Sequence, residues 1–128
     1  MVQISKYIFT KEQRARQLLA NLIVFQGKEC AEHYRMETRR LLERVRSGTA
    51  SQEEIEMVAQ AVKLLNTQAG YARLAYVLAT HFLAPEKLTA TEIAHIVHVD
   101  TRTIHRDIAS GIEQLAILLF GVDALKWR

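Results

Sequence analysis

The sequence predicts an all-α protein, a helical bundle with a carboxy-terminal helix-turn-helix. Three observations support this fold class. The chain of 128 residues is 49% hydrophobic and 24% charged, so it can bury the core of one domain. It has one proline and five glycines, too few for the turns of a many-stranded β fold. Its apolar residues recur at the three- and four-residue spacing of helices.

The first predicted helix lies near the amino terminus. Leu18, Leu22 and Phe25 form one apolar stripe at helical spacing. We expect this helix to begin after an N-cap at Thr10 and to stop near Gly27.

A basic amphipathic helix is predicted next, over residues 28–46. Ten of the 17 Lys and Arg residues precede residue 51, and six of those ten lie in this helix. Two interpretations stand side by side. The arginines contact phosphates of a nucleic acid, or they form salt bridges with glutamates that interleave with them at helical spacing. Under the first interpretation, the auxiliary phosphate contacts are Arg35, Arg39 and Arg40.

The middle of the chain predicts further helices. Ser51 and Glu54 have the spacing of a capping box, and apolar residues at helical spacing follow them. The pattern continues past Gly70 to Phe82, either as one kinked helix or as two helices, and we expect two. Pro85 ends the segment, because the residue before a proline disfavours the α conformation.

The run over residues 88–108 predicts a helix, a tight turn and a second helix. Thr89 and Glu92 have the spacing of a capping box that starts the first of the two. Ala94 is small, which lets the backbones of the two helices cross closely at a steep angle. We expect Ile93, Val97 and Val99 to point inward.

The second helix of this pair carries the predicted site. Asp100 is its expected N-cap, after a turn at residues 98–99, and Ile104 begins its inward stripe. At about 100° per residue, Arg102 and Arg106 project opposite Ile104. This is the pattern of a recognition helix whose amino-terminal half enters the major groove of DNA. The predicted DNA-binding residues are Thr101, Arg102, Thr103, His105 and Arg106.

Gly111 lies on the inward stripe of the same helix, where glycine costs about 1 kcal/mol relative to alanine. Either a neighbouring helix, from the same chain or a second one, crosses closely there, or the helix breaks before a separate final helix over residues 112–120. The carboxy end also holds more apolar side chains than one helical face can hide, which indicates a dimer contact. These are Leu118, Leu119, Phe120, Leu125 and Trp127.

A family resemblance is visible in the same run. Residues 103–108, TIHRDI, resemble the T-[IV]-x-R-D-[IL] pattern of DeoR-like bacterial helix-turn-helix regulators, and the close resemblance covers residues 89–108. The stretch up to Leu119 is similar to the carboxy-terminal half of small phage-type transcriptional activators of the RinA and ArpU groups. Their helix-turn-helix is similar to the last region of sigma factors, so the resemblance implies promoter or operator binding by an all-helical protein.

The sequence departs from this pattern at two places. His98 stands at the turn position where such regulators usually have glycine, so the turn needs either a left-handed histidine or a different geometry. The helical pattern continues beyond Ile108, which predicts no DeoR-type wing.

We therefore expect residues 1–84 to form a helical region for oligomerisation or auxiliary contacts, and residues 85–128 to form the DNA-binding unit. The predicted function is that of a sequence-specific, DNA-binding transcriptional regulator of bacterial or phage type. Duplex DNA is the expected partner of a homodimer, with RNA polymerase as a further candidate. The alternative is a protein-interaction module that binds RNA polymerase, a sigma factor or another regulator without touching DNA.

An enzyme, a cofactor and a metal site are not expected. The chain has no Gly-rich phosphate loop, no GxSxG and no HExxH. The pairs Cys30 and His33, and His95 and His98, fall in different elements without a CxxC motif. The single cysteine and the lack of an apolar stretch of roughly 18 residues predict a cytoplasmic protein that does not enter a membrane.

Overall fold

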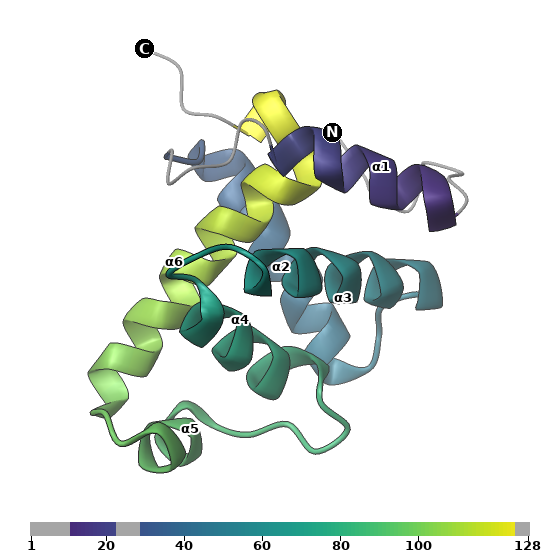
Figure 1. The fold of residues 1–128 in the computed structure, drawn as a ribbon. Helices are drawn as coiled ribbons and strands as arrows, with labels where there is room; N and C mark the ends of the chain where they lie inside the picture. The colour runs from purple at the N-terminus through teal and green to yellow at the C-terminus, as the bar shows by residue number, and fades with distance from the viewer. Residues whose placement is uncertain (1–10, 23–28, 125–128) are drawn as a thin grey trace.

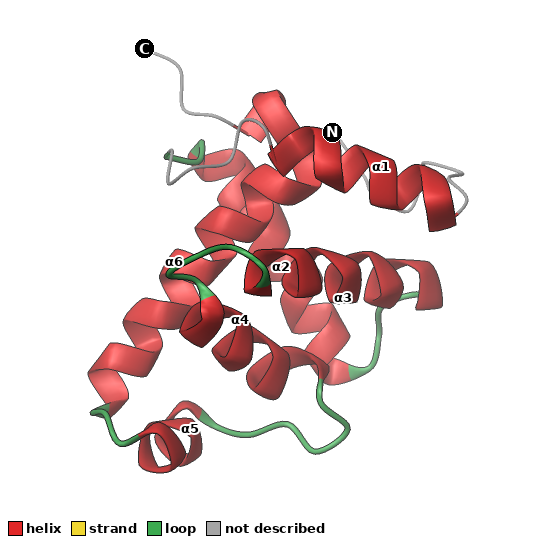
Figure 2. Ribbon diagram, in the orientation of Figure 1, coloured by secondary structure: helices red, strands yellow, loops and turns green. Residues whose placement is uncertain are grey.

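The fold, seen in a computed structural model, is an all-α bundle, which confirms the predicted fold class (Figures 1 and 2). The structure describes residues 11–22 and 29–124, and these contain no strand. The helices are α1 (Lys11–Leu22), α2 (Glu32–Ser47), α3 (Gln52–Asn66), α4 (Ala72–Leu78), α5 (Ala90–Val97) and α6 (Thr101–Phe120). A π-helical turn, η2 (Ala79–Leu83), extends α4, and a 3₁₀ turn, η3 (Gly121–Ala124), follows α6.

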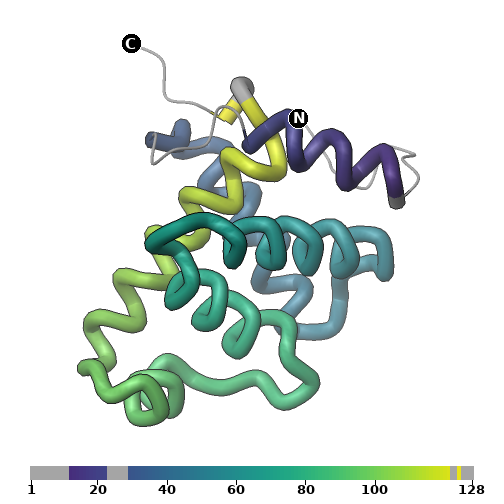
Figure 3. The backbone as a smooth tube through the Cα atoms, viewed as in Figure 1, coloured from purple at the N-terminus to yellow at the C-terminus, as the bar shows by residue number. Residues whose placement is uncertain are grey.

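Helix α6 is the element around which the others are arranged. It contacts α1, α2, α3, α4 and α5. Figures 1 and 3 show it crossing the molecule from α5 at its beginning to α1 at its end. One hydrophobic core is therefore shared by both halves of the chain. The α6 side chains that are completely enclosed in it include Ile104, Ile112, Leu115, Ile117 and Leu118.

Local signals place the end of α2 and the start of α3 where the sequence predicts them, whereas α2 begins at Glu32, later than the predicted start at residue 28. Ser51 and Glu54 form the expected capping box: the Glu54 N–H donates to Ser51 Oγ at 3.1 Å, and the Ser51 N–H donates to Glu54 Oε1 at 3.0 Å. Gly48 ends α2 with a left-handed φ of 81°. Leu18 is buried as expected, whereas the predicted boundary residues of α1, Thr10 and Gly27, lie outside the described residues, as does Phe25.

The segment between Ser51 and Pro85 contains two helices, as predicted. Helix α3 ends at Asn66, the chain turns through Gly70 with φ 86°, and α4 begins at Ala72. The helical path then widens into η2 and stops at Leu83, two residues before Pro85. The proline boundary predicted from the sequence is confirmed.

Helices α4 and α6 cross very closely at Gly111. A Cβ atom built there would meet Leu78 Cδ1 at 2.8 Å and Leu78 Cγ at 2.9 Å. The close crossing predicted for Gly111 is thus made by a helix of the same chain. The alternative of a separate final helix over residues 112–120 is wrong, because α6 runs unbroken through Gly111 to Phe120.

The carboxy end of α6 is covered by α1 and α2. Asn21 Nδ2 donates to the carbonyl oxygen of Leu118 at 2.6 Å, and the rings of Tyr34 and Phe120 lie 5.0 Å apart. Leu118 and Leu119 are buried within the chain. Contacts inside one subunit therefore account for the apolar residues of α6 that indicated a dimer surface. The other two of that group, Leu125 and Trp127, lie outside the described residues.

The turn after α6 generates a stability prediction. Gly121 has φ 66°, and a Cβ atom there would lie 2.5 Å from Asn21 Oδ1. We expect Gly121→Ala to lower the free energy of unfolding by about 2–4 kcal/mol, because backbone strain adds to a steric clash. Gly48→Ala is the matched control, since Gly48 has φ 81° and open space around its Cα. It should cost only the strain, roughly 1–2 kcal/mol.

Urea unfolding followed by far-UV circular dichroism would measure both variants. If Gly121→Ala and Gly48→Ala lowered the free energy of unfolding equally, the tight packing of Asn21 against Gly121 would be contradicted.

Candidate nucleic-acid interface

The helix pair α5–α6 begins with the capping box expected at Thr89 and Glu92. The Glu92 N–H donates to Thr89 Oγ1 at 3.2 Å, and the Thr89 N–H donates to Glu92 Oε1 at 2.9 Å. Helix α5 buries Ile93 completely and Ala94 almost completely, so its small residue does face α6 and the core. Both features were predicted from local spacing alone.

The turn between the two helices passes through a left-handed histidine. His98 has φ 60° and ψ 46°, and among the described residues it is the non-glycine residue with a positive φ. The Val99 N–H donates to the carbonyl oxygen of Ala94 at 3.1 Å, and the Val99 side chain packs against the core. Of the two geometries that the sequence left open, the chain adopts the strained one, with a histidine where glycine is preferred.

Asp100 fixes the start of α6. Its Oδ1 accepts hydrogen bonds from the Thr103 N–H at 2.7 Å and from Thr103 Oγ1 at 2.8 Å. These bonds lower the pKa of Asp100, so the cap stays ionised at neutral pH. The predicted N-cap is confirmed, and the Thr103 hydroxyl is already engaged. A phosphate oxygen only accepts hydrogen bonds, so Thr103 has to release Asp100 before it can donate to a phosphate.

The first half of α6 presents its predicted polar face to solvent. Arg102, His105 and Arg106 are exposed, Thr101 is half-buried, and Ile104 on the opposite side is fully buried. Neither Arg102 nor Arg106 makes a hydrogen bond or an ion pair with another described residue. The guanidinium groups are therefore free to bind a ligand on this face.

Asp107 of α6 is held by an arginine that sequence reasoning missed. Arg73 of α4 donates from Nε to Asp107 Oδ2 at 2.8 Å and from Nη2 to Asp107 Oδ1 at 3.0 Å. The Asp107 side chain is buried, whereas that of Arg73 is 53% exposed. This paired geometry raises the pKa of Arg73, through its hydrogen bonds and its attraction to Asp107. Arg73 thus offsets the negative charge that Asp107 brings next to Arg106.

Of the three α2 arginines predicted to contact phosphates, two form salt bridges within the helix and one does not. Arg35 lies 3.6 Å from Glu32, and Arg40 lies 3.1 Å from Glu37. These are exposed pairs one turn apart on the same helix. Arg39 is exposed and has no such partner among the described residues.

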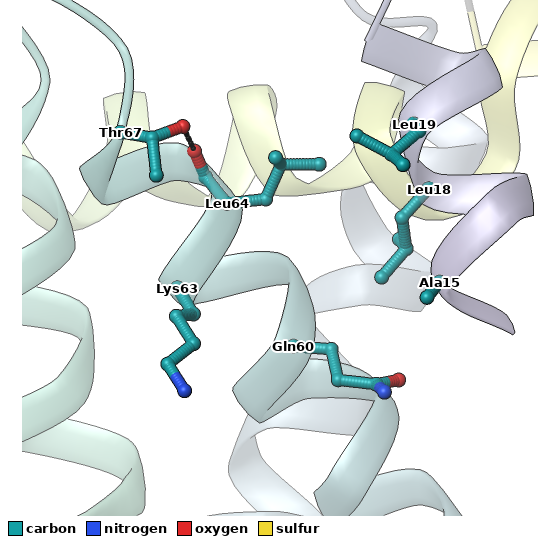
Figure 4. A pocket seen from close by; sticks show the side chains of 7 residues that line it. All are labelled: Ala15, Leu18, Leu19, Gln60, Lys63, Leu64 and Thr67. Carbon is teal, nitrogen blue, oxygen red and sulfur yellow. Dashed lines mark hydrogen bonds between the residues drawn. The ribbon is translucent and has the colours of Figure 1, made fainter. Parts of the chain in front are cut away.

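A hollow in the surface lies away from this face, between α1 and α3 (Figure 4). It is an open groove of about 280 Å³, lined mainly by apolar side chains that include Leu18, Leu19 and Leu64. Lys63 is the charged residue at its edge. The described residues contain no group of three or more His, Cys, Asp or Glu side chains arranged to hold a metal ion. Burial raises the pKa of the Cys30 thiol to about 11, which disfavours the reactive thiolate.

Comparisons with protein-family models, with curated proteins and with solved structures found no match to this chain. Within residues 11–22 and 29–124, no helix has both the length and the apolar character needed to cross a lipid bilayer. The functional interpretation consequently depends on the geometry of α5, α6 and the side chains around them.

The strained turn generates the next prediction. His98→Gly should raise the free energy of unfolding by up to about 1 kcal/mol, because glycine adopts the left-handed conformation without a steric penalty. His98→Val should lower it by at least about 1 kcal/mol, since a β-branched residue tolerates that conformation worst. Thermal unfolding of the three proteins would measure the order. A glycine variant less stable than the parent would contradict the left-handed turn.

The ion pair between Arg73 and Asp107 generates another stability prediction. Arg73→Ala should cost about 1–3 kcal/mol of unfolding free energy, because it leaves a buried carboxylate without its partner. Replacing both members, Arg73→Met with Asp107→Leu, should recover most of that loss. Arg40→Ala is the control, since it breaks an exposed pair of the ordinary kind and should cost less than about 1 kcal/mol. A double-mutant cycle in urea would show whether the two residues are coupled.

Proposed function

We propose that this protein is a sequence-specific, DNA-binding transcriptional regulator of bacterial or phage type. In this proposal α5 and α6 act as a helix-turn-helix, and the first half of α6 enters the major groove of duplex DNA. The observation that carries the proposal is the exposed face of Arg102, His105 and Arg106 on a helix whose other face is locked into the core.

The dimensions and chemistry of this face suit the major groove. An α-helix with its side chains is about 10–12 Å across, and the groove is about 12 Å wide. Arg102 and Arg106 can each donate two hydrogen bonds to O6 and N7 of a guanine, and His105 can contact a base edge or a phosphate beside them. Thr101, in the first turn of α6, is placed to contact a phosphate.

Rigidity of the helix also supports base recognition. A contact that distinguishes bases needs side chains held in one register against the groove. Here the cap at Asp100 fixes where α6 begins. Two contacts fix the rotation of α6 about its own axis: Leu78 packs on Gly111, and Arg73 pairs with Asp107. The recognition residues therefore extend from a scaffold that cannot rotate independently of the core.

A homodimer is the proposed binding form. One α6 presents few base-contacting side chains, and a two-fold dimer doubles them over two half-sites about 34 Å apart. Linking two weak sites in this way raises affinity without new contacts within a subunit.

The decisive experiment compares Arg106→Ala with Arg16→Ala. Arg106→Ala should weaken binding to a duplex of the protein's own locus by about 1–3 kcal/mol and reduce its preference over random-sequence duplex. Arg16→Ala removes the same charge from an exposed site on α1, at the far end of α6 from the proposed interface, and should leave both quantities close to those of the parent (Figure 1). Equilibrium titrations at two salt concentrations would measure these changes.

The second candidate is a protein-interaction module, in which the same helix pair binds RNA polymerase, a sigma factor or another regulator. Ile96 favours it, because this α5 side chain is 50% exposed next to the proposed interface. Counterion release makes DNA binding fall steeply with salt, whereas a mixed-charge protein contact responds less. Absence of DNA binding at low salt would reject the regulator proposal in favour of this module.

A further inference from the structure

The arginines of α2 differ in their partners. Three pair with glutamates: Arg35 with Glu32, Arg40 with Glu37, and Arg44 with Glu54 of α3 at 2.7 Å. Arg46 instead donates from Nε to the backbone carbonyl oxygen of His81, at 3.0 Å. A carbonyl group has no net charge, so the positive charge of Arg46 is not cancelled by this contact.

The contact between Arg46 and His81 has a specific cause. His81 lies in η2, which stops at Leu83, and the last carbonyl groups of a helix have no N–H donor within that helix. The Arg46 guanidinium takes the place of the missing donor. Among the described residues, one of its five N–H groups has an acceptor, and the side chain is exposed, so the others remain available to an anion.

This contact also brings α2 next to the proposed recognition helix. His81 Nδ1 donates to the carbonyl oxygen of Leu88 at 2.7 Å, just before α5 begins. Burial lowers the pKa of His81, and the nearby Arg46 and His105 lower it further against the opposing effect of the bond to Leu88. Arg46 of α2 thus contacts the segment that leads into α5, and α2 also packs against α6.

Arg39 lies on the same side of α2 as Arg46. It is exposed and has no carboxylate partner among the described residues. It precedes Arg46 by seven residues, which is two helical turns or about 10 Å along the same side of α2. Arg40 projects roughly 100° away from Arg39 around the helix. Helix α2 also packs against α6.

We propose that Arg46 and Arg39 of α2 form a second contact line for the phosphate backbone of the duplex whose major groove α6 reads. This inference rests on the proposed function and assigns a further part of the same interface. It also sorts the cations of α2: Arg46 and Arg39 bind DNA, and Arg40, on the other side, does not. Phosphate contacts of this kind add affinity and position the protein without reading sequence.

The test is the salt dependence of binding to the own-locus duplex. Each phosphate contact contributes about 0.9 to the slope of log affinity against log salt concentration. Arg46→Ala and Arg39→Ala should each reduce the magnitude of the slope by about 0.9, and the double variant by about 1.8. Arg40→Ala, which removes the same charge from the same helix, should leave the slope unchanged. Arg46→Lys should restore most of it, because the charge is retained.

The outcomes separate the two proposals. If the parent protein binds DNA and Arg106→Ala weakens it, but the α2 variants leave the slope unchanged, the second contact line is wrong and the proposed function stands. If Arg40→Ala reduces the slope as much as Arg46→Ala, the effect is general electrostatics and the assignment is also wrong. If the parent binds no duplex, both proposals fail. Arg39 is exposed and makes no hydrogen bond or ion pair with another described residue, so its variant remains informative if Arg46→Ala unfolds.

Discussion

The packing of Leu78 against Gly111 is the contact on which the rest of the structure depends. It lets α4 and α6 approach so closely that even a methyl group on Gly111 would clash. A turn away, the two hydrogen bonds between Arg73 and Asp107 join the same two helices. Since side chains rotate by about 100° per residue, two contacts four residues apart on α6 fix which of its faces points outward. The exposure of Arg102 and Arg106 follows from packing in the core.

The acidic residues around α5 and α6 serve the backbone and the core. Glu92 and Asp100 accept hydrogen bonds from the first N–H groups of the two helices, and Asp107 binds Arg73. Arg102 and Arg106 are exposed and make no hydrogen bond or ion pair with another described residue. The guanidinium groups of this region therefore remain available to a ligand, although the exposed carboxylates of Glu92 and Asp100 lie in the same region.

Sequence reasoning succeeded where the signal was local and failed where it was distant. The capping boxes at Ser51 and Thr89, the cap at Asp100 and the stop before Pro85 each depend on residues within four positions of one another. The partner of Asp107 lies 34 residues away and that of Arg46 lies 35 away, and nothing in periodicity pairs such positions. The sequence left open whether a helix crosses at Gly111 or the helix breaks there, and only the structure identifies Leu78 as the neighbour. The π-helical turn had no detectable signal either.

The carbonyl oxygen of His81 links positions that are far apart in the chain. Because the helix stops at Leu83, ahead of Pro85, no later turn of that helix donates to it, and Arg46 supplies a donor. In an evolutionary lineage of this fold, positions 46 and 85 are then expected to change together. Where proline is retained, a long donor side chain is selected at position 46, and where proline is lost, that position becomes free to diversify. A constraint of backbone chemistry would in this way preserve a surface cation that binding alone need not preserve.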